Sequence, residues 1–244
     1  MAKSPPRLAP PLLNCAACKT CKSAEWSVLG EELLPLIDEA KVTRRYRAGD
    51  PIYNQGEACT GIFCIEAGIV AVRQADTDGN SKIVRTVEAG QTLGYEDYFA
   101  GKGYRASAYC LEPATICFVG SDRLRKVLDR SPAIGLAFLA HSAEDLQQAH
   151  AMSMYQALYT VRVRVAQLLL RFKDYHGISD GKGSIEVTLP MSWHEAAELV
   201  GARAETVSRA LQALEQDHII RTEGRKVLIL DLDLLLDEIE QSGA

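Results

Sequence analysis

The chain has 244 residues, 47% of them hydrophobic and 24% charged, with a formal net charge of −5. This length and composition suit one large or two modest globular domains and exclude a disordered or collagen-like chain. Charged residues interrupt the longest apolar stretches, so none approaches the ~20 apolar residues of a membrane span, and residues 1–14 lack the apolar core of a secretory signal. We therefore expect a cytoplasmic protein without a membrane partner.

The first distinctive feature in chain order is a CxxCxxC run, in which Cys15, Cys18 and Cys21 follow a proline-rich start. A reducing compartment disfavours structural disulfides, so these thiols are candidates for metal binding or redox chemistry. Zinc is one option, although structural zinc usually uses two CxxC pairs. A thiol–disulfide switch is another. We assign residues 1–30 to a cysteine-containing N-terminal arm.

Residues 42–119 alternate short apolar runs with turns that contain glycine, aspartate or proline. Many short strands at regular turn spacing are typical of a β-sandwich or β-roll. Cys59, Cys64 and Cys110 are interpreted here as small buried hydrophobic residues in strands. The sequence therefore predicts a β-roll domain over residues 31–121.

After residue 121 the turn residues become rare and the apolar spacing changes to three and four, which is typical of one face of a helix. This stripe comprises Leu136, Leu139, Ala143, Leu146, Ala149 and Met152. Because it is narrow enough for a coiled-coil seam, we predict a dimerisation helix over residues 122–158. An amphipathic helix that lies on its own domain is the alternative.

A glycine-rich break at residues 177–183 precedes a compact C-terminal unit. Ser192 and Glu195 have the spacing of a capping box, which begins a helix ending near residue 200. Gly201 permits a sharp turn, a second helix is expected over residues 203–216, and two strand-like runs follow in residues 218–230. Helix, glycine turn, helix and hairpin make a winged helix-turn-helix, assigned to residues 159–244.

The second helix of this unit would enter the major groove of double-stranded DNA. Arg209 can donate to guanine, Glu205 can accept from cytosine, and Ser208 can contact either kind of base edge. Basic hairpin residues would contact phosphates and set the register. The full predicted DNA-binding set is Glu205, Ser208, Arg209, Arg203, Gln212, Arg221, Arg225 and Lys226. A solvated helix face with a Glu205–Arg209 pair is the alternative.

In this order the elements resemble the CRP/FNR superfamily of bacterial transcription regulators over about residues 25–235. The resemblance rests on Gly49-Asp50, Gly56, Gly68, Gly90, Leu93-Gly94-Tyr95-Glu96 and the AETVSR segment at residues 204–209. It implies an α+β homodimer without enzymatic activity, with RNA polymerase as a further partner. The ExxSR pattern resembles the FNR branch, which implies a palindromic operator with TTGAT-like half-sites.

The resemblance also bears on the signal that the protein senses. Relatives that bind cyclic nucleotides use Gly-Glu for the ribose and Arg-Ser for the phosphate, whereas this chain has Gly90-Gln91 and Arg105-Ala106-Ser107, which disfavours both contacts.

Oxygen-sensing FNR-type regulators instead hold a [4Fe–4S] cluster on three N-terminal cysteines and one in the β-roll. By this resemblance the ligands are Cys15, Cys18, Cys21 and Cys117, with Cys110 as the alternative fourth ligand. The cluster would sense oxygen, redox state or nitric oxide. The same fold with zinc, a thiol switch, a small molecule or a cyclic nucleotide remains the alternative.

Overall fold

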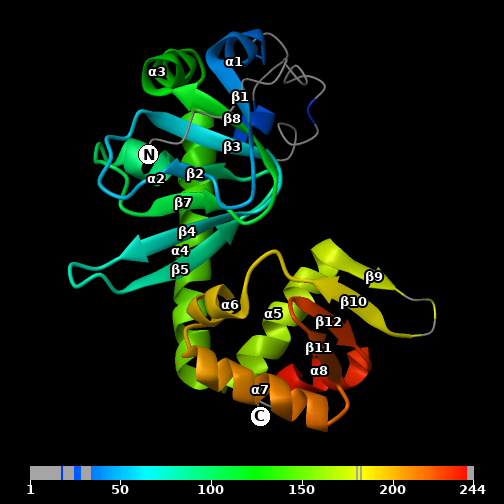
Figure 1. Ribbon diagram of the computed structural model, residues 1–244. Coiled ribbons are helices and arrows are strands. Elements are labelled where there is room, and N and C mark those ends of the chain that lie inside the picture. The colour runs from blue at the N-terminus through cyan, green and yellow to red at the C-terminus, as the bar shows by residue number, and fades with distance from the viewer. Residues whose placement is uncertain (1–17, 19–24, 29–33, 180, 182, 241–244) are drawn as a thin grey trace. The chain divides into compact units, whose positions relative to one another are not determined.

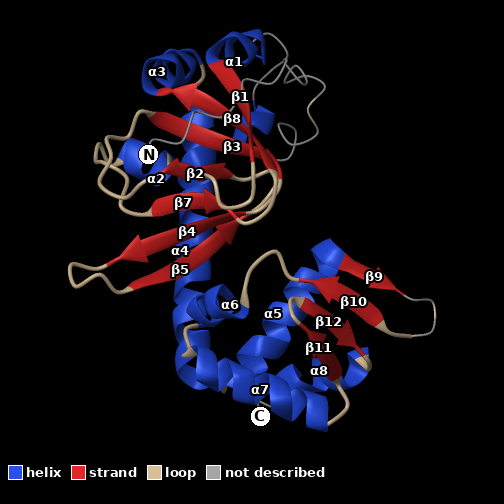
Figure 2. Cartoon of the chain, viewed as in Figure 1, coloured by secondary structure: helices blue, strands red, loops and turns tan. Residues whose placement is uncertain are grey.

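The computed structural model describes residues 18, 25–28, 34–179, 181 and 183–240 (Figure 1). The chain divides into two compact units, residues 1–147 and 148–244. The first unit is mainly strands with helices at its periphery, and the second combines helices with one small sheet (Figure 2). This confirms the predicted α+β class. No helix among the described residues is long and apolar enough to cross a membrane.

The first unit contains the predicted β-roll, built from two four-stranded antiparallel sheets. One sheet has the order β1 (Lys41–Tyr46), β8 (Ala114–Gly120), β3 (Gly61–Ala67) and β6 (Thr92–Leu93). The other has the order β2 (Pro51–Tyr53), β7 (Ser107–Cys110), β4 (Val70–Ala75) and β5 (Ser81–Val87). Because side chains alternate across a strand, each sheet presents one face to the other sheet and one face outward.

Aromatic side chains fill the core between the two sheets. The Tyr53 and Tyr104 rings stack with centroids 4.0 Å apart, and Phe63 lies 5.5 Å from Tyr53. A second core covers the outer face of the β1–β8–β3–β6 sheet, where Ile62 and Val119 are buried beneath helices. Five helices contribute residues to this cover: η1 (Glu25–Val28), α1 (Leu34–Ala40), α2 (Tyr95–Phe99), α3 (Ser121–Arg130) and α4 (Pro132–Leu158).

The prediction of a single helix over residues 122–158 is wrong. The structure has α3, then Ser131, then a separate helix α4 (Pro132–Leu158). Pro132 opens α4, where its missing N–H costs nothing, but its ring would clash with the preceding turn if α3 continued. The division into units falls inside α4, at residues 147 and 148, and not at the predicted boundary after residue 158.

The second unit contains the predicted helix-turn-helix and hairpin. It comprises the last part of α4 followed by α5 (Val161–His176), β9 (Gly177–Ser179), β10 (Ile185–Thr188), α6 (Trp193–Val200), α7 (Ala204–Gln216), β11 (Ile220–Glu223), β12 (Lys226–Ile229) and α8 (Leu232–Glu240). The hairpin belongs to a four-stranded sheet with the order β11, β12, β10, β9. The predicted glycine-rich break is therefore a connection inside this unit, between β9 and β10, and not the start of it.

The predicted capping box at the start of α6 is present. The Glu195 backbone N–H donates to Ser192 Oγ over 3.3 Å, and Glu195 Oε2 accepts from the Ser192 backbone N–H over 2.8 Å. Gly201 ends the helix with φ of 68°, a left-handed conformation that glycine adopts at little cost. A Cβ there would lie 2.9 Å from the Gln156 side chain. The turn between α6 and α7 is thus fixed by local backbone chemistry.

Replacing Ser192 with alanine removes one partner of this capping box. We expect Ser192→Ala to lower the free energy of unfolding by about 1 kcal/mol, as for other N-cap serines. The measurement is urea unfolding of the full-length chain. Ser208→Ala is the matched control, because Ser208 is exposed within α7 and alanine favours a helix interior. Equal unfolding midpoints for Ser192→Ala and the unchanged protein would contradict a stabilising role for the cap.

Candidate nucleic-acid interface and cysteine site

Helix α7 has one buried and one exposed face. Val207, Leu211 and Leu214 are buried in the second unit. The four predicted DNA-binding residues within this helix are exposed on the other side: Glu205, Ser208, Arg209 and Gln212. Arg203 is the N-cap residue and its side chain makes no capping hydrogen bond. The exposed face therefore presents a carboxylate, a hydroxyl, a guanidinium and an amide together.

The β11–β12 hairpin carries the predicted phosphate contacts, and Arg221, Arg225 and Lys226 are all exposed. Its turn is tied to the start of α6, because Trp193 Nε1 donates to the Gly224 carbonyl over 2.8 Å. Lys226 also lies 3.1 Å from Glu186 on β10. The hairpin is thus held by α6 at its tip and by the neighbouring strand β10 along β12.

Arg164 on α5 fixes the other side of the helix pair. Its Nη1 donates to the carbonyl oxygens of Val200 (2.5 Å) and Gly201 (3.1 Å), which end α6. These carbonyls have no partner within their own helix, so the guanidinium supplies them with hydrogen bonds. Its positive charge also interacts favourably with the negative end of the helix dipole. The role of Arg164 was not predicted, because nothing in the sequence spacing links it to Gly201.

The predicted dimerisation stripe on α4 is exposed. Leu136, Leu139 and Leu146 have 67%, 65% and 57% of their surface accessible, and Met152 has 41%. Ala143 and Ala149 are also outside the buried core. A row of large exposed apolar side chains is unfavourable in water and marks a contact surface.

The cysteines fall on different faces of the β-roll. Cys110 is fully buried between the two sheets, and burial raises its pKa to about 12. Cys64 and Cys117 are direct register partners on β3 and β8 and share the outer face of their sheet with Ile62 and Val119. Cys110 therefore matches the prediction of a buried strand residue, Cys64 lies in a strand but is only half-buried, and the prediction is wrong for Cys59, which lies in the loop before β3. Cys15 and Cys21 lie outside the described residues.

Helix η1 connects the end of the predicted arm to this outer face. Trp26 is buried, and its Nε1 donates to Cys64 Sγ over 2.8 Å. The neighbouring Glu25 carboxylate accepts from Thr92 Oγ1 over 2.9 Å. Two consecutive side chains thus bind the segment that follows the CxxCxxC run to strands β3 and β6.

A polar cluster continues from Glu25 into α4. His141 Nδ1 lies 3.2 Å from Glu25 Oε1, and His141 Nε2 lies 3.6 Å from Asp145 Oδ1. Asp145 Oδ2 in turn accepts from Arg85 and from the Tyr95 hydroxyl, each over 2.6 Å.

Glu96 completes this cluster on its far side, where Arg85 Nη2 donates to it over 2.5 Å. Burial raises the pKa of the Glu96 carboxyl, and the nearby guanidinium of Arg85 opposes that rise. The cluster joins η1, β5, α2 and α4. The cluster was not predictable from sequence spacing, because its members are far apart in the chain.

The groups expected to face a cyclic nucleotide are engaged with other residues of the chain. Arg105 Nε donates to Asp97 Oδ1 over 2.8 Å. Ser107 Oγ accepts from the Gln55 backbone N–H over 2.9 Å. Gln91 Oε1 accepts from the Glu88 backbone N–H over 2.8 Å. An anion that approached Arg105 would have to compete with a carboxylate already present.

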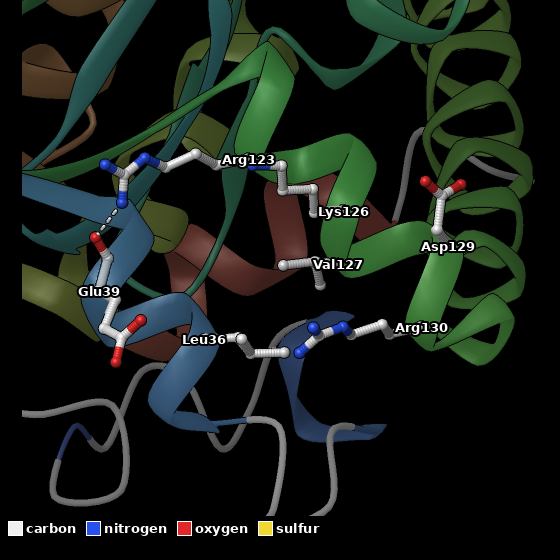
Figure 3. A pocket seen from close by; sticks show the side chains of 7 residues that line it. All are labelled: Leu36, Glu39, Arg123, Lys126, Val127, Asp129 and Arg130. Carbon is white, nitrogen blue, oxygen red and sulfur yellow. Dashed lines mark hydrogen bonds between the residues drawn. The ribbon is translucent and has the colours of Figure 1, made fainter.

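A separate surface pocket of about 470 Å³ lies between α1 and α3 (Figure 3). The pocket is lined by three cationic side chains, those of Arg123, Lys126 and Arg130. It is also lined by two carboxylates, those of Glu39 and Asp129. Arg123 also donates to the Glu39 carbonyl oxygen, which ties α3 to the end of α1. This mixed charge suits packing between the two helices.

Comparison with known proteins gives matches over most of the chain. The family described as "Cyclic nucleotide-binding domain" matches residues 43–131, and "Crp-like helix-turn-helix domain" matches residues 163–238. The transcriptional activator protein FnrL of Cereibacter sphaeroides is 25% identical over 235 residues, covering 93% of this chain and 89% of the relative.

Two further proteins are similar to this chain over most of its length. A CRP-like cAMP-activated global transcriptional regulator of Mycobacterium tuberculosis is 28% identical over 188 residues, covering 77% of this chain and 83% of that protein. The crystal structure of a CRP-family transcriptional regulator from Thermus thermophilus superposes with a TM-score of 0.68 at 26% identity, covering 81% of this chain and 96% of the other.

The polar cluster around Asp145 gives a stability prediction. Asp145→Asn keeps the shape of the side chain but removes the charge that Arg85 pairs with, in a site where both side chains are at most 30% exposed. We expect the free energy of unfolding to fall by about 2 kcal/mol. Thermal unfolding of the full-length protein measures this.

Asp174→Asn is the matched control, since Asp174 is 67% exposed beside Lys173. Surface ion pairs contribute little, so this variant should stay within about 0.5 kcal/mol of the unchanged protein. Equal losses in the two variants would mean that the cluster has no special role in stability.

Proposed function

The chain belongs to the CRP/FNR family of DNA-binding transcription regulators, and we propose that it is an FNR-type sensor with an N-terminal [4Fe–4S] cluster. In this proposal the cluster responds to oxygen, redox state or nitric oxide, and a homodimer binds a palindromic operator with TTGAT-like half-sites. The observation that carries it is the anchoring of the arm on the sheet face that bears Cys117.

The residues present fit a thiolate-bound cluster. Cys21 precedes Trp26 by five residues, a length of chain that spans at most ~18 Å. Trp26 contacts Cys64, which lies directly beside Cys117, so the arm thiols can reach this face. Cys110 suits the role less well, because it lies between the two sheets, in the aromatic core. Cys15, Cys18, Cys21 and Cys117 would hold the cluster, which would supply an oxidant-sensitive iron centre.

The polar cluster offers a physical route from the arm to α4. Glu25 follows the arm cysteines and contacts His141 on α4, which in turn contacts Asp145. A signal can shift an equilibrium between arrangements only by binding them with different affinity. If the arm seats Glu25 in one state and withdraws it in another, α4 loses a buried carboxylate partner in the second state.

The second unit supplies the proposed contacts with DNA. Arg209, Glu205 and Ser208 would read base edges in the major groove, while the hairpin cations neutralise phosphates. Pairing of two chains through the α4 stripe would place two copies of α7 at half-sites one DNA turn apart. RNA polymerase is the further partner that we propose for this regulator.

A regulator of the same fold that responds to a cyclic nucleotide is the second candidate. The matched domain description and the cAMP-activated relative favour it. The Arg105–Asp97 pair argues against it. Isothermal titration with cAMP separates the two. Binding at micromolar concentration would support the cyclic-nucleotide candidate, and the absence of binding would leave the cluster candidate.

Zinc binding by the arm, or a thiol switch in it, is distinguished from a cluster by colour, because either would give a colourless protein.

Anaerobic purification tests the cluster. We expect broad absorbance near ~400 nm, with about four irons per chain, which air bleaches. Cys117→Ser should lose the absorbance and iron, whereas the matched control Cys110→Ser should keep both. A protein that remains colourless after anaerobic reconstitution with iron and sulfide would overturn the proposal. If Cys110→Ser lost the iron and Cys117→Ser kept it, the fourth ligand would be Cys110.

Arg209→Ala tests the reading of DNA bases. If Arg209 grips guanine, the variant should lose about 1–3 kcal/mol of binding to a palindromic TTGAT-like operator and little toward scrambled DNA. Fluorescence anisotropy at one fixed salt concentration measures both. Arg130→Ala removes the same charge from exposed α3 and serves as the control. An unchanged preference for operator over scrambled DNA would exclude Arg209 from base recognition.

A further inference from the structure

Cys64 and Cys117 occupy adjacent positions on neighbouring antiparallel strands. Their register is direct, with Phe63 opposite Phe118 on one side and Ile65 opposite Ile116 on the other. Residues directly opposite each other in such a ladder point to the same face. The two sulfur atoms therefore share the outer face of the β1–β8–β3–β6 sheet.

The backbone hydrogen bonds fix the spacing of this pair. The Ile65 N–H donates to the Gln91 carbonyl and the Ile65 carbonyl accepts from the Gly90 N–H, so Ile65 faces β6. Backbone groups alternate along a strand, so those of Cys64 face β8 and its partner Cys117. Such hydrogen-bonded pairs have Cα atoms about 5.5 Å apart, within the ~4.4–6.8 Å that disulfides span.

The surroundings of the two thiols differ. Cys64 lies under the Trp26 indole, whose Nε1 is 2.8 Å from the sulfur. Cys117 Sγ is 3.4 Å from Thr43 Oγ1 and 4.0 Å from Glu66 Oε2. Both cysteines are partly exposed, so the difference between them lies in the indole contact that Cys64 makes. We therefore expect Cys117 to react first with a small oxidant, and Cys64 to react with it once Trp26 moves away.

We propose that Cys64 and Cys117 form a cross-strand dithiol site, which hydrogen peroxide oxidises to an intramolecular disulfide when Cys117 holds no metal. The Cys117 sulfur attacks peroxide, which breaks the O–O bond and gives a sulfenic acid and one water. The Cys64 sulfur then attacks the Cys117 sulfur, the S–O bond breaks, and the hydroxyl leaves as a second water with the Cys64 proton. Two thiols are oxidised and one peroxide is reduced.

This site goes beyond the proposed iron–sulfur function. It shares Cys117 with the proposed cluster, so cluster and disulfide exclude each other, but the strand register alone sets the pair. A disulfide would also keep Cys117 from taking a new cluster until a reductant restores the thiol.

The experiment uses the full-length chain with Cys15→Ser, Cys18→Ser and Cys21→Ser, which leaves four cysteines. After exposure to hydrogen peroxide, free thiols should fall from four to two, and peptide mass mapping should find one disulfide, between Cys64 and Cys117. Dithiothreitol should restore four thiols. Retention of four thiols, or a bridge that contains Cys59 or Cys110, would overturn the proposal.

Two variants in the same background sharpen the test. Cys64→Ser should form no intramolecular bridge and leave Cys117 as a sulfenic acid, which a dimedone-type reagent traps. Trp26→Phe keeps an aromatic ring but removes the N–H that donates to Cys64 Sγ. Cys64 should then be freer to attack Cys117, so the disulfide should form faster. An unchanged rate would show that the Trp26 hydrogen bond does not restrain Cys64. Because this background lacks the arm ligands, the outcome is independent of the iron content of the unaltered protein, which tests the cluster separately.

Discussion

The seating of η1 on the β-roll is the interaction on which the rest of the first unit depends. Trp26 and Glu25 are consecutive, so one short segment binds β3 through a sulfur and β6 through a hydroxyl. Trp26 also packs edge-on against Phe138 of α4, with ring centroids 5.7 Å apart. A buried carboxylate is costly unless its oxygens have partners. Thr92 donates to Glu25 Oε2, whereas Oε1 makes no hydrogen bond among the described residues and lies 3.2 Å from His141 Nδ1. The position of Glu25 therefore depends on the Thr92 hydroxyl and on the nearby imidazole.

The alternation of strand side chains places the cysteines on two different faces of the sheets. Cys110 points between the sheets, into a core filled by Tyr53 and Tyr104, where a metal ligand would have no access to the arm. Cys64 and Cys117 point outward, beneath the segment that the arm leads into. A shift of register by one residue would exchange these faces, and the arm would then meet aromatic rings in place of thiols.

Much of this arrangement follows from local sequence signals, and some of it does not. The capping box, Gly201 and the spacing of Val207, Leu211 and Leu214 act within one or two helical turns, so the helix-turn-helix was predictable. Strands β9 and β10 were missed because the glycines between them form a turn inside a sheet, and one helix was predicted where Pro132 begins another. The Glu25–His141 contact joins residues more than a hundred positions apart, and only the tertiary fold brings them together.

Helix α4 presents two faces whose relation follows from its geometry. Residues advance by about 100° around a helix, so Phe138, His141 and Asp145 fall on one side, packed on the β-roll. Leu136, Leu139 and Leu146 fall roughly opposite them and are exposed. The stripe then turns around the helix toward Met152, beyond the last residue that contacts the polar cluster. The first half of α4 can therefore pack on the β-roll with one face while its apolar stripe stays exposed on the other. Because both faces belong to one helix, a shift of α4 at the polar cluster also moves the apolar stripe.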